Sequence, residues 1–439
     1  MTAKTPQGVE QNPAYRLQRY VFFSLGYVNP PPRSLPPPQT LMFKHLRICL
    51  FFALAFSSAL AQPASAESPA MRAQRMSRDA ESRGLAEAFR GITADGRVEK
   101  NLFPLRSTGV STAPVRIAAQ TFLQGLNADQ RKRTVFPVDD AEWRKWMNQH
   151  FYVRQGVSFL EMSPAQRESA FTLLRASLSA RGLQLSQDIM KLNHTLGELN
   201  NNNFTEYGEW LYHVTIMGEP SADKPWGWQL DGHHLIINYF VLGDQVVMSP
   251  VFVGSEPVVA PSGRYQGVAI LQAEQRAGLD LLRSLDPTQR QQAVLNANKT
   301  GNNNLTEAFK DNVVLAYEGI PAAHLSAAQK SNLLALVNHF IANQSAGHAQ
   351  IKMEEVRAHL ERTYFAWVGG HADDSVFYFR IHSPVVLIEF DHQRPANLKH
   401  LAANPQLPNR EHIHVVIRTP NGNDYGKDLL SQHLTQHPH

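Results

Sequence analysis

Beyond residue 66, segments with the pattern of helix starts alternate with segments that have the pattern of β-strands. In four places an apolar residue precedes Asn, Asp or Ser, and Gln follows three positions later. This spacing is typical of a capping box, in which the first side chain accepts from a backbone N–H group and the Gln side chain reaches back to the cap. The pattern predicts helix starts at Asn127, Ser163, Asp286 and Ser326.

Runs of β-branched and aromatic residues lie between the second and third helix starts, and again after the fourth. Gly243 and Asp244 separate two of these runs and indicate a hairpin. The runs predict strands at 210–217, 234–241, 245–250, 363–368, 376–382, 385–390 and 412–418. Blocks of helices and blocks of strands indicate an α+β fold, with helical segments packed against a mostly antiparallel sheet.

The first 66 residues follow a different pattern. After Met42, a short basic region precedes an apolar run that is too short to span a bilayer. Small residues then offer cleavage after Ala61 or Ala66. Residues 42–66 are therefore predicted to be a signal peptide. The mature protein is expected in the periplasm or outside the cell, without stable membrane insertion.

Two segments flank this predicted signal. Residues 1–41 contain two Pro-rich runs, and we interpret them as an over-extended N-terminus or, alternatively, as a long leader. Residues 67–84 are assigned to a linker. The remainder, 85–439, is expected to form a single α+β domain.

Removing the leader changes the charge balance. The whole chain has 42 basic and 38 acidic side chains, and residues 1–66 hold six of the basic and one of the acidic ones. The mature part therefore carries 36 basic and 37 acidic side chains, so its net charge gives no reason to expect a nucleic-acid partner. The only cysteine, Cys49, lies in the leader. The mature fold must then rely on its core rather than on disulfides.

Recurring motifs suggest an internal duplication. The four capping motifs share their Gln, but successive Gln residues are 36, 123 and 40 positions apart, which is too irregular for a solenoid. Two Asn runs, 200–203 and 302–304, are each followed by an apolar residue and Thr-Glu. Because Asn tolerates left-handed backbone geometry, these runs are expected to form loops.

Two histidines near the C-terminus have the spacing of metal ligands. His412 and His414 are two residues apart on a predicted strand, so both imidazoles point to the same face. Such a pair suits Zn²⁺, Cu²⁺, Ni²⁺ or Fe²⁺. Two ligands do not complete a site, and further candidates must come from elsewhere in the chain.

These candidates lie in two segments rich in the same residue types. One is the pair His233 and His234, of which one is expected to be a ligand and the other a structural or substrate-contacting partner. The other segment contributes Glu389 and His392 at the end of an apolar strand. Hydrogen-bonded histidines in the core or at its rim are the alternative interpretation of all these residues.

The segment before the His pair is rich in aromatic residues. Trp226 and Trp228 alternate around Gly227 and are interpreted either as core residues near a tight turn or as an aromatic wall for a sugar ring or flat ligand. Asp231 could orient an imidazole or act as a general base. The residues themselves leave these alternatives open.

A turn at 419–426 follows the strand of the His pair and is expected to lie near it. Asp424 is therefore a candidate catalytic residue, and Tyr425 a candidate substrate contact, although a plain turn explains both. Arg418 could hold a carboxylate or phosphate, or form a salt bridge.

Several familiar motifs are absent. The chain contains no HExxH, GxSxG or HxHxDH motif, and no GxGxxG or P-loop sequence. The glutamate that follows the His-x-His of a cupin is also missing. Nucleotide-binding α/β folds and the common hydrolase families are thus disfavoured.

The segments 226–234, 412–414 and 418–426 resemble the DUF3500 family of uncharacterised exported proteins, and the likeness extends from about residue 85 onward. The resemblance implies membership of a family but no activity. The first hypothesis is therefore an exported metal-dependent hydrolase with a His-rich site. The alternative is a non-catalytic exported protein that binds a carbohydrate or another small ligand.

Overall fold

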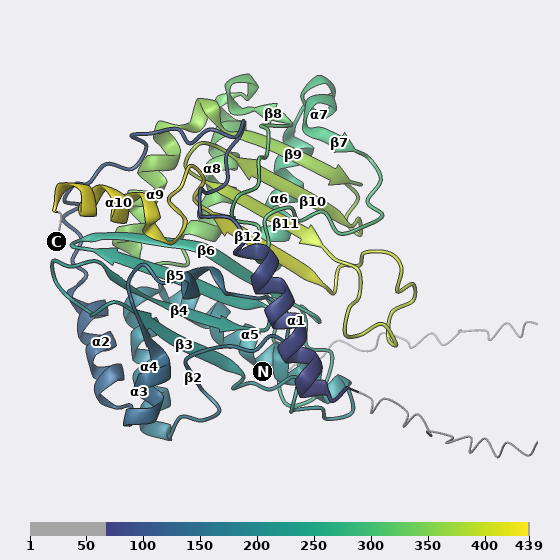
Figure 1. The fold of residues 1–439 in the computed structure, drawn as a ribbon. Coiled ribbons are helices and arrows are strands. Elements are labelled where there is room, and N and C mark those ends of the chain that lie inside the picture. Colours follow the sequence, from purple (N-terminus) through teal and green to yellow (C-terminus); the bar gives the residue numbers. More distant parts are fainter. Residues whose placement is uncertain (1–66, 438–439) are drawn as a thin grey trace, which may run out of the picture. The chain divides into compact units, whose positions relative to one another are not determined.

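A single twelve-stranded sheet organises the part of the chain that the computed structural model describes, residues 67–437 (Figure 1). Its strands follow the order β1-β3-β4-β5-β6-β12-β11-β10-β9-β7, with β2 paired to β3 and β8 to β9. The strands are β1 Val135–Phe136, β2 Val157–Ser158, β3 Tyr212–Met217, β4 Trp226–Gly232, β5 Leu235–Leu242, β6 Gln245–Ser255, β7 Val294–Asn296, β8 Ile320–Pro321, β9 Tyr364–Gly369, β10 Phe377–His382, β11 Leu387–His392 and β12 Ile413–Arg418.

The sheet is mixed. β1 pairs in parallel with β3, and β7 in parallel with β9. The other described pairs, including β6 with β12 in the centre, are antiparallel. The expected α+β class is confirmed, and the two parallel pairs are additions to the mostly antiparallel sheet that was predicted.

Ten α-helices accompany the sheet within the described residues: α1 Pro69–Gly84, α2 Ala113–Gln124, α3 Ala128–Thr134, α4 Pro164–Ser177, α5 Ala180–Leu199, α6 Gln272–Ser284, α7 Pro287–Ala293, α8 Ala327–Ile341, α9 Ala346–Ala358 and α10 Lys427–Gln436. The four predicted capping boxes are confirmed, because the caps of α3, α4, α7 and α8 each make both reciprocal hydrogen bonds.

The two halves of the sheet repeat one order of elements. In each, a short helix leads into a strand that pairs in parallel with the first long strand (α3–β1 with β3, α7–β7 with β9). The capping glutamines also pair in both halves, Gln166 with Gln130 at 2.7 Å and Gln329 with Gln289 at 2.7 Å. The repeated Gln motif therefore has one structural role, which is to join two neighbouring helix starts.

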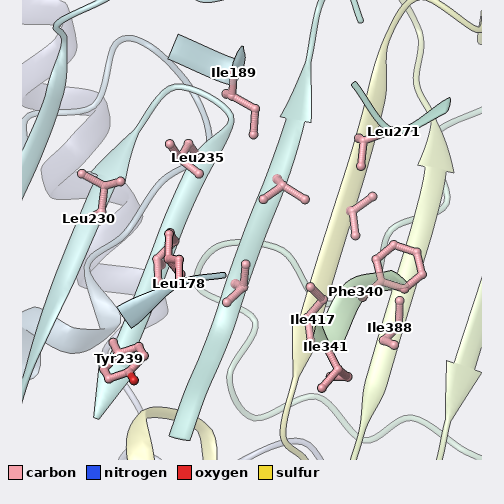
Figure 2. Close-up of a cluster of buried hydrophobic side chains, with 14 of the residues drawn as sticks. Leu178, Ile189, Leu230, Leu235, Tyr239, Leu271, Phe340, Ile341, Ile388 and Ile417 are labelled. Carbon is pink, nitrogen blue, oxygen red and sulfur yellow. The ribbon is translucent and has the colours of Figure 1, made fainter. Parts of the chain in front are cut away.

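Apolar residues cover both faces of the sheet. On one face the strands pack against α2, α4, α5, α6, α8 and α9, and Figure 2 shows Ile388 and Ile417 of this core beside Phe340 and Ile341. On the other face a smaller cluster joins Phe252 of β6 and Val416 of β12 to Trp146 and to Leu429 of α10.

Most predicted strands agree with the structure to within two residues at their ends, although β6 continues to Ser255 beyond the predicted end at 250. The main omission is β4, Trp226–Gly232, which pairs with both β3 and β5. The predicted hairpin at Gly243–Asp244 joins β5 and β6. Both Asn runs lie in loops or turns, as expected.

The assignment of residues 67–84 to a linker is corrected, because α1 occupies 69–84. The hydroxyl of Ser68 accepts from the backbone N–H of Met71, and Pro69 occupies the first turn. Ser77 in turn accepts from the N–H of Val153, which fastens the helix to the domain. The predicted signal peptide and the segment before it lie outside the described residues.

No helix among the described residues is both long enough and apolar enough to cross a lipid bilayer.

Candidate metal centre

Three buried histidines converge on one point. The Nε2 atoms of His412 and His414 are 3.0 Å apart. The Nε2 atom of His234 lies 3.1 Å from that of His414 and 3.3 Å from that of His412. The three residues are 3–7% exposed. We refer to His234, His412 and His414 as the histidine triad. Among the described residues, these three form a group that could hold a metal ion.

The triad is assembled from two parts of the sheet. His412 precedes β12 and His414 is its second residue, so the two rings share one face as predicted. His234 occupies the turn between β4 and β5 with a left-handed backbone (φ 61°). Its N–H donates to the carbonyl of Asn148, and its carbonyl accepts from Gly254, the residue paired with His414 across β6 and β12.

Gly254 allows the two central strands to approach each other beside the triad. A Cβ atom at this position would lie 2.4 Å from the carbonyl oxygen of Ile413. Any larger residue would therefore displace the backbone that leads into His414. The glycine is thus part of the geometry that sets the distance between the turn of β4–β5 and β12.

Two rings of the triad have their second nitrogen occupied. The Nδ1 atom of His412 lies 2.7 Å from the carbonyl oxygen of Arg394, and that of His414 lies 2.7 Å from a carboxylate oxygen of Glu307. The carbonyl of Arg394 accepts from Nδ1 of His412. Burial raises the pKa of Glu307 to about 7, and in its ionised form Glu307 accepts from Nδ1 of His414. The Nε2 atoms are then unprotonated in the neutral rings, and their lone pairs face the centre of the triad.

Burial favours these neutral rings. It lowers the pKa of His414 well below the usual value, and the neighbouring His412 lowers it further. The pKa of His234 is lowered in the same way, first by burial and then by both partners. Neutral imidazole is the form that binds a metal ion, so the low pKa keeps the rings of His234 and His414 ready to bind.

Buried carboxylates hold the loop that carries Glu307. Glu389 accepts hydrogen bonds from the backbone N–H groups of Leu305 and Thr306. Asp391 accepts from the N–H of Asn303 at 2.6 Å. The Asn-rich segment is therefore bound through its backbone across one face of β11, and the next residue along the loop, Glu307, reaches the triad.

Arg418 holds the same loop from β12. Its guanidinium donates to the carbonyl oxygens of Thr306 and Glu307 and forms ion pairs with Asp311 and Asp424 at 2.8 and 3.2 Å. The side chains of Arg418, Asp311 and Asp424 are all buried. The predicted salt-bridge role of Arg418 is thus the one that the structure shows.

Glu389 and His392 do not join the triad, contrary to the sequence-based expectation. Glu389 is committed to the backbone of the Asn-rich loop and to the hydroxyl of Tyr378. His392 points to the opposite face of β11, where Nδ1 accepts from the N–H of Phe377 and Nε2 lies 2.6 Å from the side-chain oxygen of Gln275. Strand alternation separates the two side chains.

His233 is the structural partner of the His pair. Its Nδ1 atom lies 2.8 Å from the side-chain oxygen of Asn193, and its ring stacks on that of His234 at 4.0 Å. It therefore restricts the orientation of His234 without pointing a nitrogen into the triad. One member of the pair thus lies in the triad and the other beside it.

Asp231 acts on the triad only through the backbone. It forms a buried ion pair with Arg154 at 3.0 Å, and burial raises its pKa to about 6. Arg154 also donates to the carbonyls of Met147 and Gln149, on either side of the Asn148 carbonyl that binds His234. Asp231 therefore lies outside the triad, and the contact that the structure shows for it is the ion pair with Arg154.

The turn at 419–426 lies at the opposite end of β12 from His414, which corrects the expectation that it adjoins the His pair. Asp424 binds Arg418 and the N–H of Thr419, and the hydroxyl of Tyr425 donates to Asp311. A strand runs in one direction, so the loop that leaves its C-terminal end cannot meet side chains at its N-terminal end.

The two tryptophans are core residues. Trp226 and Trp228 are fully buried in β4. Trp228 stacks on Tyr239 of β5 with ring centroids 5.3 Å apart, and the indole N–H of Trp226 donates to the carbonyl of Ser221. The aromatic wall that the sequence allowed is corrected to packing between two strands and the helices behind them.

Glu307 and Asn148 were missed in the sequence. Glu307 closes the motif Asn-Asn-Asn-Leu-Thr-Glu, which was noted only as an echo of 200–206. Nothing in the sequence around Glu307 indicates that its carboxylate contacts His414, which is 107 positions away. Asn148 contributes only a backbone carbonyl, which any residue type provides.

Comparison with known proteins gave one match. No curated protein and no solved structure matched the chain. A family model described as "Protein of unknown function (DUF3500)" matches residues 108–427, which include the whole triad and the loop of Glu307. The match covers most of the chain, in agreement with the resemblance seen in the sequence. The chain therefore belongs to the DUF3500 family.

Proposed function

We propose that this protein is an exported metal-dependent hydrolase in which the histidine triad binds a divalent ion. The observation that carries the proposal is the convergence of three Nε2 atoms at 3.0–3.3 Å. Three metal–nitrogen bonds of about 2.0–2.1 Å at tetrahedral angles would place the nitrogens roughly 3.3–3.4 Å apart. The triad is therefore close to the geometry of a bound ion.

The ligand set favours a catalytic centre over a structural one. Structural zinc sites are closed by four protein ligands, whereas catalytic sites use three and leave one position open. Among the described residues, the three side chains of the triad are the group that could hold the ion, which leaves a fourth coordination position without a protein ligand. A divalent ion in such a site polarises a substrate oxygen and lowers the pKa of a water molecule at the open position, which is the chemistry of hydrolysis.

Residues around the triad would keep the ligands in place. Glu307 and the carbonyl of Arg394 fix the rings of His414 and His412 through their Nδ1 atoms. Such outer partners set the tautomer and orientation of a ligand and raise its basicity. Imidazole ligands suit Zn²⁺, Cu²⁺, Ni²⁺ and Fe²⁺, so the donor set allows all four.

The geometry gives less support to a non-catalytic carbohydrate-binding protein. That alternative relied on Trp226 and Trp228 as an exposed platform, and both are fully buried. A small molecule or a carbohydrate is then proposed as the substrate of the metal centre. Export to the periplasm or beyond remains part of the proposal, and it rests on the signal-like pattern of residues 42–66.

Metal analysis of tag-free protein tests the centre itself. We expect about one equivalent of a divalent ion in the wild type after exposure to a mixture of the four metals, and loss of that ion in His412→Ala and His414→Ala. His371→Ala, which changes an exposed histidine outside the triad, should retain it. A wild-type protein that binds no stoichiometric ion would overturn the metal centre and with it the proposed function.

A second assay tests the reaction class. Metal-loaded protein is incubated with chromogenic carboxylic esters, phosphate esters, amides and glycosides, and each rate is compared with that of chelator-treated protein and of His414→Ala. Hydrolysis of at least one class that requires both the ion and the triad would support the proposal. Stoichiometric metal without hydrolysis of any class would refute the hydrolase and leave the metal centre intact.

A further inference from the structure

A cavity of about 350 Å³ lies at the other end of the two central strands. Its walls include the start of β6 and the end of β12, together with residues of α8, α9 and α10. The lining residue of β6 nearest to the triad is Val251, three residues before Gly254, a separation of about 10 Å along the strand. The cavity is therefore separate from the triad, and none of the three histidines lines it.

Apolar and polar side chains both line the cavity. Phe103 and Val247 line it from one side of the sheet, and Phe340 and Ile341 line it from α8. Figure 2 shows Phe340 and Ile341 beside Ile417, the strand residue next to the cavity. These side chains are buried, so they offer a dry surface to the apolar body of a ligand. The volume falls within the usual range for small-molecule sites, about 300–1,000 Å³.

Gln344 and Arg106 line the cavity and have no side-chain hydrogen-bond or ion-pair partner among the described residues. Gln344 is 5% exposed, and no hydrogen bond joins its side-chain amide to another described residue. The guanidinium of Arg106, at the exposed side of the cavity, likewise makes no hydrogen bond or ion pair within the described residues. Both groups are positioned to bind oxygen atoms of a ligand.

Other charged side chains of the lining make contacts of their own. Lys352 pairs with Glu355 at 3.0 Å, donates to the carbonyl of Val385 and lies over the ring of Phe103. Glu354 accepts from the side chain of Gln350. Among the described residues neither Arg106 nor Glu354 has an ion-pair partner, so the lining offers one unpaired cation and one unpaired anion, and a ligand carboxylate would pair with Arg106.

We propose that this cavity binds an amphipathic carboxylate of about ten carbons. Its carboxylate pairs with Arg106 at the mouth, its chain packs against the apolar lining, and an oxygen atom along the chain accepts from the amide of Gln344. This site is independent of the proposed metal chemistry. A molecule of that size binds with a dissociation constant on the order of 10–100 µM.

Isothermal titration calorimetry of the full-length mature protein tests the proposal. The probes are decanoate, 10-hydroxydecanoate and, with the opposite charge, decyltrimethylammonium. We expect one equivalent of decanoate to bind, tighter binding of the hydroxylated chain, and no binding of the cation. Failure of both carboxylates to bind at 1 mM, or equal binding of the cation, would overturn the proposal.

Three variants locate the binding. Arg106→Ala should weaken decanoate binding at least fivefold, whereas Arg78→Ala, which also removes an exposed arginine, should not. Gln344→Leu should abolish the preference for the hydroxylated chain. Met248→Trp fills the cavity and should abolish binding. If Met248→Trp does not fold, Arg106→Ala still tests the proposal, because an unchanged affinity of this surface variant for decanoate would show that the ligand does not bind at the proposed site.

Discussion

The hydrogen bond at one nitrogen of His414 determines what the other nitrogen can do. Glu307 accepts from Nδ1 at 2.7 Å, so Nε2 presents a lone pair to the two other rings of the triad. A carboxylate in this position also makes the ligand more basic. A residue that touches no metal ion can therefore control how tightly the ion is held.

Removing this carboxylate should weaken metal binding. We expect Glu307→Ala to bind Zn²⁺ roughly 10–100-fold more weakly than the wild type, measured by competition with a chromogenic chelator. Glu307→Gln keeps an acceptor oxygen and should lose less. Glu354→Ala, which removes an exposed carboxylate from α9, is the control. Equal affinity of Glu307→Ala and wild type would contradict the assigned role.

A second histidine links stability to pH. His382 at the end of β10 is 1% exposed, and burial, with a smaller effect of Arg380, lowers its pKa to about 3. The ordinary value of 6.5 applies to the unfolded chain. Between these values the unfolded chain binds a proton that the folded protein does not. Stability is thus complete above pH 6.5 and decreases as the pH falls towards 3.

His382→Gln removes this proton-binding difference. Urea unfolding at pH 7 and pH 5 should show that the wild type loses about 2 kcal/mol more stability than the variant over this interval. The comparison between the two proteins cancels the effect of other titrating groups. Identical losses would mean that His382 is protonated in the folded protein or that it contacts a compensating acid.

At the scale of elements, the helix caps are the features that local sequence specifies most directly. Ser326 caps α8 with a reciprocal capping box, and Gln329 of that box also bonds to Gln289, which belongs to the box of α7. A cap therefore orients its own helix and joins it to the next. This double use explains why the same Gln recurs at four helix starts.

Loss of the cap should cost a measurable part of the stability. Ser326→Ala should lower the free energy of unfolding by about 1 kcal/mol, as measured by denaturant titration. Ser331→Ala, at an exposed position inside the same helix, should be neutral or slightly stabilising. If the two variants have the same free energy of unfolding, the capping hydrogen bond does not contribute to stability.

Around the triad, the sequence predicts the local pair of histidines but not the residue that binds to it from another part of the chain. The His412–His414 pair was predicted because alternation along a strand is a local property. The bond between Glu307 and His414 depends on buried contacts of Glu389 and Arg418 with the backbone of the loop. The sequence pattern does not predict such contacts, because the loop contributes backbone groups, which are the same in every residue type.

At the scale of the whole molecule, the triad joins the two halves of the sheet. His234 comes from the turn of β4–β5 in the first half, and the other two histidines come from the start of β12 and the residue before it in the second. The central pair β6–β12 brings them together. An ion bound here would hold the halves to each other and would bind only the folded protein.

Metal binding should therefore stabilise the entire fold. At free Zn²⁺ one hundred times the dissociation constant, we expect about 2.7 kcal/mol of added stability, observed as a rise in the midpoint of thermal or urea unfolding. A chelator should reverse the effect, and His412→Ala should abolish it. A shift of equal size in His412→Ala would place the stabilising ion elsewhere.

By itself, the amino-acid sequence determined the features that depend on a few neighbouring residues. These were the four helix starts, most of the strands, the hairpin at Gly243–Asp244 and the shared face of His412 and His414. Capping, turn formation and strand alternation are short-range effects, so a window of several residues contains their cause. The resemblance of three longer segments also identified the family correctly.

The tertiary structure alone decided which candidate side chains meet. Strand register and the close approach at Gly254 placed His234 beside His414. The same register kept His392 on the other face of β11 and the turn at 419–426 at the far end of β12. Pairings of this kind link residues about 180 positions apart. They follow from the packing of the whole sheet, because no short segment contains both partners.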